Sequence, residues 1–498
     1  MAQNIRVQKT FEALFALEDI REIFRGTLPT GLSETEEQEF QKKVSDLKEI
    51  INELESGKGN PKVMRLAGNL PIRDREESFI NIQPIQAAGR LTVEARKALI
   101  VYGDGYSTCD SCKKPFRLDK ITKPGIADFY VELADFLNMD EARVVPGTRR
   151  GFQAVASSLL EKEDTAIVSS LSHYTKFLSV ENAGGVVKEV PLNENNIITA
   201  GATAEKIEEV IRETGKTPKI VMMDHFDYQF ANEHEIKGIA KVSHQYDIPL
   251  LYNGAYTVGV MPVDGKDLGA DFVIGSGHKS MASAAPSGVL ATTEEWAPIV
   301  FRTTPVLHQL NKKIIYPHYD FKHLTEKYFE IGMKLNDFSI QLVKYCTQMK
   351  GDLTGRKFGI KEVEMLGCTL MRGTLFSMMA SFPAVKERVK NWDEEVSKSN
   401  YLIERILSIS GSKVLSEYPR KHALTKIDTT DSFDTVAKNH PKRGYYLSNE
   451  LSKRGIIGVF PGATKAWKLS TYGLSRDKVK YLGDSLVEIA KKNGLEVR

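Results

Sequence analysis

Cysteine is scarce in this chain, with 4 residues in 498. So few cysteines do not form the disulfide framework of a small secreted protein, and we expect a reducing, cytoplasmic compartment. No apolar run is long enough to cross a bilayer, and residues 1–6 lack the apolar stretch of a secretory signal, so we expect no membrane partner. The formal net charge of +3 is too small to indicate a nucleic-acid partner by itself.

The length predicts two or three domains, and the first of them is a helical hairpin over residues 1–60. Apolar residues recur at helical spacing in two segments that Pro29 and Gly31 separate. Ser33 and Glu36 form a capping box at the start of the second segment. The hairpin either packs on the rest of this chain or serves as a docking arm for another protein, and the sequence favours neither.

Residues 77–301 alternate short apolar runs with amphipathic segments. The predicted strands are Thr165–Val168, Ile220–Met223, Pro249–Tyr252, Phe272–Ile274 and Gly288–Ala291, and the predicted helices are Phe152–Glu161, Ala204–Glu213 and Glu235–Tyr246. This alternation predicts a large α/β domain with a mostly parallel sheet, which binds ligands at the carboxyl ends of its strands. Residues 302–360 lack the strand rhythm and are interpreted as an insertion, and residues 361–498 as a small C-terminal α/β domain.

Lys279 follows the predicted strand at 272–274 directly, in a segment of small residues. Lysine forms Schiff bases readily, because its pKa shifts when it is buried or lies near other cations. Gly277 allows close approach of the backbone to a phosphate, which Ser276 and His278 could bind as donors. The alternative is a solvated loop lysine, the usual fate of this residue type.

Three other segments favour a pyridoxal-phosphate (PLP) site. Asn253 follows a predicted strand 26 residues before Lys279 and could face the ring nitrogen of PLP, where aspartate is the common partner. Thr148 and Arg149 precede a predicted helix, whose N-terminus is an anion site. His173, after the strand at 165–168, could stack on a flat heterocycle.

The sequence resembles a known family through several motifs that occur in the same order. The segments 147–149, 173–174, 253–256 and 276–279 resemble fold-type I PLP enzymes of the cysteine-desulfurase branch. Further stretches resemble the archaeal O-phosphoseryl-tRNA:cysteinyl-tRNA synthases; these are residues 79–84, 103–107, 248–251, 275–281, 366–369, 379–383 and 468–474. The resemblance covers roughly residues 79–300 and 362–490.

The resemblance implies that the protein converts O-phosphoseryl-tRNA(Cys) into cysteinyl-tRNA(Cys) by loss of phosphate from the β-carbon and addition of sulfur. It implies that Lys279 carries PLP and that His173 stacks on its ring. The remaining cofactor contacts that it implies are Thr148, Arg149, Asn253, Ser276, Gly277 and His278. The resemblance also implies that the enzyme forms a homodimer. Where family members often have Asn near the cofactor oxygen, the nearest match here is Gln229.

The cysteines bear on the sulfur step. Cys109 and Cys112 form a CxxC pair, which by itself is a zinc half-site, a redox pair or a coincidence. Because the family uses three such cysteines, the resemblance implies that Cys109, Cys112 and Cys368 handle sulfur. They do so as a persulfide relay or as ligands of an iron–sulfur cluster. Cys346 falls in the predicted insertion and is interpreted as a packing residue.

Partners and rival functions follow from the same comparison. Residues 1–60 are similar in style to a separate scaffold protein that bridges the family's enzyme and a phosphoseryl-tRNA synthetase. Lys468 stands where desulfurases bind a free carboxylate with Arg, a clamp that a substrate esterified to tRNA does not need. The rivals are a cysteine desulfurase or selenocysteine lyase that acts on a free amino acid, and a non-catalytic adaptor of a tRNA-channelling assembly. The sulfur step implies a sulfur donor as a further partner.

Overall fold

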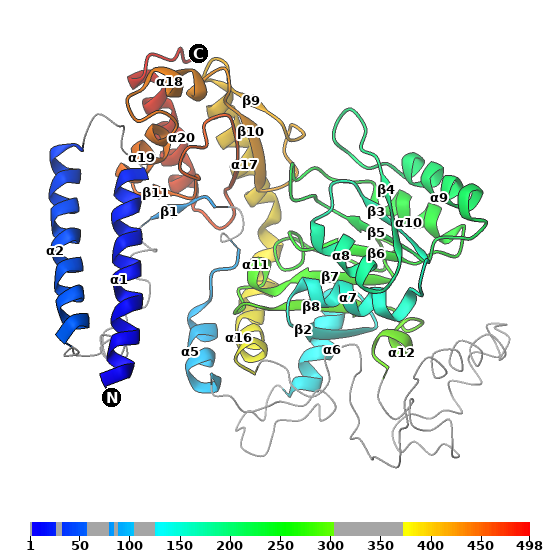
Figure 1. The fold of residues 1–498 in the computed structure, drawn as a ribbon. Coiled ribbons are helices and arrows are strands. Elements are labelled where there is room, and N and C mark those ends of the chain that lie inside the picture. The colour runs from blue at the N-terminus through cyan, green and yellow to red at the C-terminus, as the bar shows by residue number, and fades with distance from the viewer. Residues whose placement is uncertain (1, 26–31, 57–78, 84–87, 104–124, 303–371) are drawn as a thin grey trace. The chain divides into compact units, whose positions relative to one another are not determined.

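The computed structural model describes residues 2–25, 32–56, 79–83, 88–103, 125–302 and 372–498 (Figure 1). The chain divides into two compact units, one made of residues 1–87 and 393–498 and the other of residues 88–392. The predicted insertion at 302–360 lies outside the described residues, apart from its first residue. None of the described helices combines the length and the apolar character that crossing a membrane requires.

The unit of residues 88–392 is built on a seven-stranded sheet in the order β2-β8-β7-β6-β5-β3-β4. Its strands are β2 (Glu141–Val145), β3 (Thr165–Ser169), β4 (Val186–Val190), β5 (Ile220–Asp224), β6 (Leu250–Gly254), β7 (Phe272–Ser276) and β8 (Gly288–Thr292). Only β8 runs antiparallel to its neighbours β2 and β7, and the other pairs of this sheet are parallel. The predicted mostly parallel sheet is therefore confirmed, and the five predicted strands are present.

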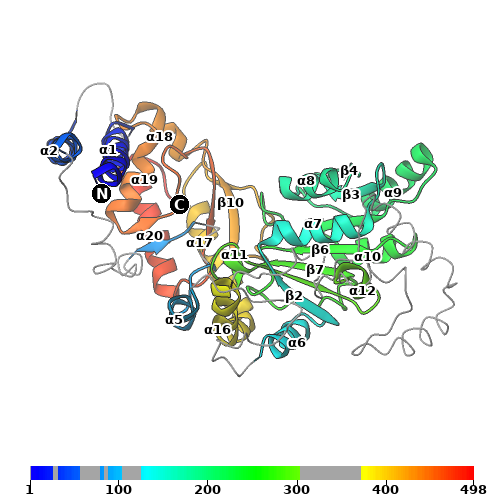
Figure 2. The ribbon, with the colours of Figure 1, turned by 60° about the horizontal axis from the view of Figure 1, so that its bottom comes forward.

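Helices cover both faces of this sheet (Figures 1 and 2). They are α5 (Val93–Tyr102), α6 (Ile126–Phe136), α7 (Thr148–Leu159), α8 (Tyr174–Asn182), α9 (Ala200–Thr214), α10 (Ile236–His244), α11 (Gly277–Ser280), α12 (Ala297–Val300) and α16 (Arg372–Arg388), followed by the short η3 (Val389–Asn391). Alternate strand residues enter different cores, as side chains of a strand must. Val221 and Met223 pack with α6, α9, α10 and α16, whereas Ile220 and Met222 pack with α7, α8 and α12.

The other unit has a smaller α/β core. Its elements are β1 (Ile80–Asn81), α17 (Trp392–Leu407), β9 (Lys413–Val414), β10 (Leu424–Asp428), α18 (Phe433–Asn439), α19 (Tyr445–Lys453), β11 (Ile456–Ile457), β12 (Ala466–Ser470) and α20 (Arg476–Lys492). Strands β12, β10 and β9 form an antiparallel sheet, and β1 pairs in parallel with β11. Apolar residues of α17 and α20 fill the core beside them.

This division differs from the expected domain boundaries at two places. Strand β1, expected in the domain of residues 77–301, pairs with the strand at 456–457 instead. Helix α16, expected in the domain of residues 361–498, belongs to the unit with the large sheet. There, Ser377 accepts a hydrogen bond from the amide of Ala284 at 3.0 Å, and the Ser381 hydroxyl donates to the carbonyl of Met281 at 2.9 Å.

The two N-terminal helices, α1 (Ala2–Arg25) and α2 (Glu34–Ser56), pack against each other as the predicted hairpin requires. The rings of Phe24 and Phe40 meet edge to face, with centroids 5.2 Å apart. The amide of Ser33 donates to the Glu36 carboxylate at 2.9 Å, and the amide of Glu36 donates to the Ser33 hydroxyl at 3.4 Å, so the predicted capping box is present. The Ser33 hydrogen bonds lower the pKa of Glu36 to about 2.

The core beneath α16 gives a test of the packing. Phe382 is 2% exposed, and its ring meets those of Phe129 and Phe136 at centroid distances of 5.2 Å in both cases. We expect Phe382→Ala to lower the free energy of unfolding by about 3–5 kcal/mol, because it removes both contacts and leaves a cavity. Urea unfolding followed by circular dichroism measures this. Val131→Ala, at a position 62% exposed, is the matched control, and equal midpoints for the two variants would contradict the expectation.

Candidate active site

Lys279 lies in α11, one turn of helix that follows the carboxyl end of β7 directly. The turn is closed by the Ser280 hydroxyl, which donates to the carbonyl of Ser276 at 2.7 Å. The Nζ of Lys279 lies 4.7 Å from the centroid of the Tyr256 ring. Burial raises the pKa of Tyr256 to about 12, so this ring stays a neutral phenol beside the amine.

His173 lies on the same edge of the sheet, because β3 runs parallel to β5 and His173 follows it as the N-cap of α8. Its ring stands edge to face with the ring of Tyr228, with centroids 5.5 Å apart. Burial, and then the charge of Lys279, lowers the pKa of His173. The ring of Tyr174 also lies close, with its centroid 4.4 Å from that of His173. A neutral imidazole is suited to stacking on a flat heterocycle. Tyr228, the neighbour of Gln229, supplies the contact with this histidine.

The segments around Thr148, Ser276 and Ser287 converge on one point. Strand β8 starts at Gly288, which pairs with Ser276 on one side and with Val145 on the other. Helix α7 begins beside it at Thr148, so the N-terminus of this helix lies in the same region. A Cβ on Gly288 would lie 2.7 Å from the Thr148 nitrogen, so only glycine fits there.

Two hydroxyl groups at this point are suited to binding an anion. The Oγ atoms of Ser276 and Ser287 are buried and have no hydrogen-bond partner among the described residues. Gly277 has no room for a side chain, since its Cβ would lie 2.4 Å from the Ser287 Oγ. The Nδ1 of His278 lies 3.1 Å from the carbonyl oxygen of Ser287 and holds the two segments together. Buried hydroxyls without partners beside a helix N-terminus fit the phosphate of PLP.

Asn253 lies on β6, opposite Asp224 on β5 in the register of the sheet. Its amide nitrogen donates to the Asp224 carboxylate, which also accepts from Lys176 Nζ at 2.6 Å. Sequence reasoning found Asn253 but missed Asp224 and Lys176. A carboxylate that ends a fully buried apolar strand was the available signal for Asp224. The complete burial of Lys176 had no signal in the sequence, because a lysine in a helix usually lies in solvent.

Arg388, at the end of α16, holds the turn that carries Lys279. Its Nε donates to the carbonyl of Gly259 at 2.9 Å, and its Nη2 donates to the carbonyls of Ser280 and, at 3.3 Å, Ala88. One guanidinium therefore joins three segments that are far apart in the sequence. Sequence reasoning missed this residue as well.

The remaining predicted residues are Arg149, which follows Thr148 in α7, Lys468 and the cysteines. The side chain of Arg149 is exposed, and Lys468 lies on β12 of the other unit. All four cysteines, Cys109, Cys112, Cys346 and Cys368, lie outside the described residues. Within the described part of the chain, no group of three His, Cys, Asp or Glu side chains is arranged to hold a metal ion.

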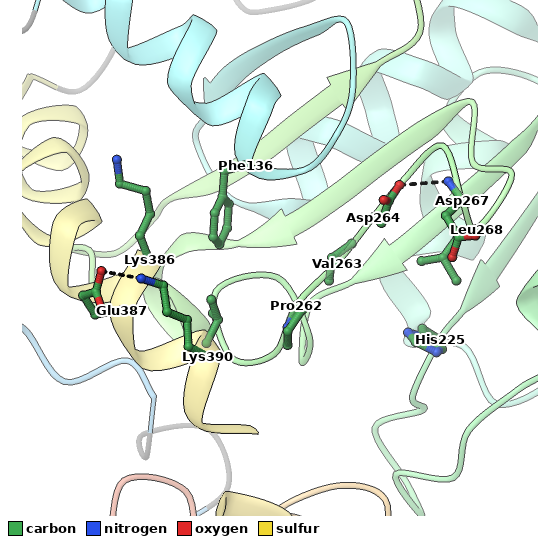
Figure 3. Close-up of a pocket in the computed structure, with 11 residues that line it drawn as sticks. Phe136, His225, Pro262, Val263, Asp264, Asp267, Leu268, Lys386, Glu387 and Lys390 are labelled. Atoms are coloured by element: carbon green, nitrogen blue, oxygen red, sulfur yellow. Dashed lines mark hydrogen bonds and ion pairs between the residues drawn. The ribbon is translucent and has the colours of Figure 1, made fainter. Parts of the chain in front are cut away.

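A separate groove of about 680 Å³ lies between α6, the loop after β6, the end of α16 and η3 (Figure 3). Its walls carry Lys386, Glu387 and Lys390 on one side and Asp264 and Asp267 on the other. Lys390 and Glu387 form an ion pair at 2.7 Å. The groove contains none of the predicted site residues.

Comparisons with known proteins agree with this architecture. The Aminotransferase class-V family model matches residues 119–300. The chain is 65% identical over 494 residues to O-phospho-L-seryl-tRNA:Cys-tRNA synthase 2 of Methanoregula boonei, with 99% of each chain covered. A solved structure of a SepCysS–SepCysE N-terminal domain complex has a TM-score of 0.69 and 34% identity, and the match covers 86% of this chain and 98% of that one.

A more distant structure supports the fold alone. The apo cysteine desulfurase of Thermococcus onnurineus NA1 matches with a TM-score of 0.57 at 15% identity, covering 84% of this chain and 96% of that one. The predicted fold-type I architecture is thus confirmed, and with it a PLP-dependent transferase. The 65% identity over 494 residues assigns the chain to the synthases rather than to the cysteine desulfurases that share this fold. This chain belongs to the family of O-phospho-L-seryl-tRNA:Cys-tRNA synthases.

Proposed function

We propose that this chain converts O-phosphoseryl-tRNA(Cys) into cysteinyl-tRNA(Cys). The observation that carries the proposal is the 65% identity over 494 residues to a synthase named for this reaction. The 15% identity to a cysteine desulfurase supports only a shared fold, so the desulfurase alternative is disfavoured. A non-catalytic adaptor would not need Lys279 beside a phosphate-binding point.

The residues around Lys279 fit PLP, and we assign their roles on that basis. When bound, PLP supplies an electron sink for the charge that develops on the substrate's α-carbon. Lys279 would hold the cofactor covalently, and its Nζ would serve as the base that takes the α-proton of the substrate. Ser276, Gly277 and His278 would hold the cofactor phosphate together with the two residues that open α7, Thr148 and Arg149. His173 would hold the ring by stacking on it, and Asn253 would be the partner of the ring nitrogen.

The substrate reaches this site as an ester, so the enzyme has no free carboxylate to bind. Lys468, where desulfurases use Arg, agrees with an esterified substrate, since only Arg offers a rigid two-pronged clamp. The sulfur step is assigned to Cys109, Cys112 and Cys368, as a persulfide relay or as ligands of an iron–sulfur cluster. The sulfur donor is a further partner, and the enzyme acts as a homodimer.

Residues 1–60 are proposed as the docking arm for a phosphoseryl-tRNA synthetase. Leu14, Leu17 and Phe24 are 55%, 51% and 49% exposed on α1, an apolar surface beyond what the contact between α1 and α2 buries. The matched structure of a SepCysS–SepCysE N-terminal domain complex covers 86% of this chain, which leaves about a seventh of it without a counterpart. That remainder is close to the length of the hairpin.

The reaction is tested with purified protein, O-phosphoseryl-tRNA(Cys) and sulfide. We expect cysteine on the tRNA, identified by mass spectrometry after mild hydrolysis of the ester. Seryl-tRNA(Cys) is the matched control, because it lacks the phosphate leaving group and should give no cysteine. Rapid sulfide release from free cysteine, together with no cysteine on the tRNA, would overturn the proposal in favour of the desulfurase.

The role of Lys279 is tested by borohydride reduction followed by peptide mapping. We expect the reduced cofactor on the peptide that contains Lys279, and a loss of activity of at least roughly 10²–10⁴-fold in Lys279→Ala, the range for removing a general acid–base group. Lys237→Ala is the matched control, because Lys237 is 60% exposed in the same unit. A label on any other lysine would contradict the assignment.

The docking arm is tested by binding assays with a phosphoseryl-tRNA synthetase. We expect Leu14→Ser combined with Leu17→Ser to weaken binding about tenfold or more, because burying two leucines contributes about 1.5–3 kcal/mol each. The control pair is Ser45→Ala with Lys48→Ala, two exposed polar positions on α2. If deletion of residues 1–60 leaves binding undiminished, the hairpin is not the docking arm.

A further inference from the structure

We infer that Asp224, held in place by Lys176, is a positioning residue that fixes the side-chain amide of Asn253 for the ring nitrogen of the cofactor. The inference rests on the proposed function, since it assumes that PLP binds at Lys279. It adds two residues of this chain, Asp224 and Lys176, that have no direct place in the proposed chemistry.

The amide of Asn253 is anchored at both ends. Its Nδ2 donates to Oδ1 of Asp224, and its Oδ1 accepts from the amide of Ala255 at 3.2 Å. Rotation of the amide by 180° would place Oδ1 against a carboxylate and Nδ2 against an N–H group. Both contacts would become repulsive, so one orientation is strongly favoured. Asn253 and Asp224 are 7% and 3% exposed, so water does not compete for these bonds.

Asp224 itself accepts hydrogen bonds from two donors, both of which lie in the short segment of residues 172–176. Lys176, whose side chain is 0% exposed, donates to Oδ2 of Asp224 at 2.6 Å. The Ser172 hydroxyl donates to the same oxygen at 3.0 Å. A lone carboxylate at this depth would be costly, and the lysine offsets its charge. Ser172 and Lys176 flank His173, so one short segment of chain holds both the stacking ring and the carboxylate.

The orientation of Asn253 matters because an amide can act either as donor or as acceptor. Its oxygen would favour a protonated ring nitrogen, whereas its N–H would favour an unprotonated one. The strength of the electron sink depends on that proton. An aspartate in direct contact would fix the choice by its charge. Here the carboxylate stands one strand away and acts through the amide of Asn253.

The experiment uses the full-length protein loaded with PLP. The main variant is Asp224→Leu combined with Lys176→Met, which removes both charges together, leaves no buried ion without its partner and takes away the acceptor of the Asn253 hydrogen bond. Its readouts are the visible absorbance band of the bound cofactor, the Kd for PLP and the melting temperature of the protein without PLP. The matched control is Glu141→Gln with Arg143→Met, another ion pair with one buried partner, on β2 of the same sheet.

We expect the main variant to shift the absorbance band and to raise the Kd for PLP about tenfold, as loss of one well-placed hydrogen bond predicts. The control pair should change the melting temperature alone. Adding Asn253→Ala to the main variant should raise the Kd no further than Asn253→Ala does by itself, because Asp224 acts through that amide. If the main variant does not fold, Ser172→Ala, which keeps both charges, should shift the band in the same direction.

Two results would overturn the inference. The first is an unchanged band and a Kd within twofold of the unmodified protein, and the second is an effect on Kd that simply adds to that of Asn253→Ala. Borohydride labelling of Lys279 in the unmodified protein separates these from a failure of the proposed function. An absent label removes the PLP site, whereas a normal label with an unchanged band removes only the role of Asp224.

Discussion

Hydrogen bonds between three neighbouring parallel strands, β5, β6 and β7, bring their last residues side by side. Asp224 ends β5 and pairs with Asn253, the last residue but one of β6. Asn253 pairs in turn with Ile274, two positions before Ser276, which ends β7. Because parallel strands present their carboxyl ends at one edge, the turn with Lys279 and the loop with His173 meet there without long connections. The electrostatic and hydrogen-bonding features of the site depend on this alignment.

Local sequence signals were sufficient for the residues that follow strands. Apolar runs predicted β3, β5, β6, β7 and β8, and small or polar residues after them predicted Lys279, Asn253 and His173. The edge strands β2 and β4 were not predicted, because β4 is partly exposed and β2 is a short run separated from α6 only by residues 137–140. β2 is a strand because it pairs with β8, and β4 is a strand because it pairs with β3. The local sequence of one segment does not show which other segment it pairs with.

Long-range contacts explain what the sequence could not supply. From the sequence alone, Lys176 would be predicted to be a solvent-exposed lysine of a helix, and Asp224 to be the first residue of a turn. Only the contact between α8 and β5 shows that the two side chains pair. The placement of α16 with the large sheet depends on hydroxyl contacts such as Ser381 with Met281, which join residues 100 positions apart. The close approach of Gly288 to Thr148 likewise appears only when three strands are assembled.

The guanidinium of Arg388 ties the turn of Lys279 to the last residue of α16, only five positions before Asp393, where the other compact unit resumes. Through Arg388, the turn that carries the reactive amine is hydrogen-bonded to a segment close to the boundary between the two units, more than a hundred residues away in the sequence. Efforts to engineer the enzyme, or to interpret natural variants, therefore have reason to treat Arg388 as part of the support of the active site, although it belongs to no recognised motif.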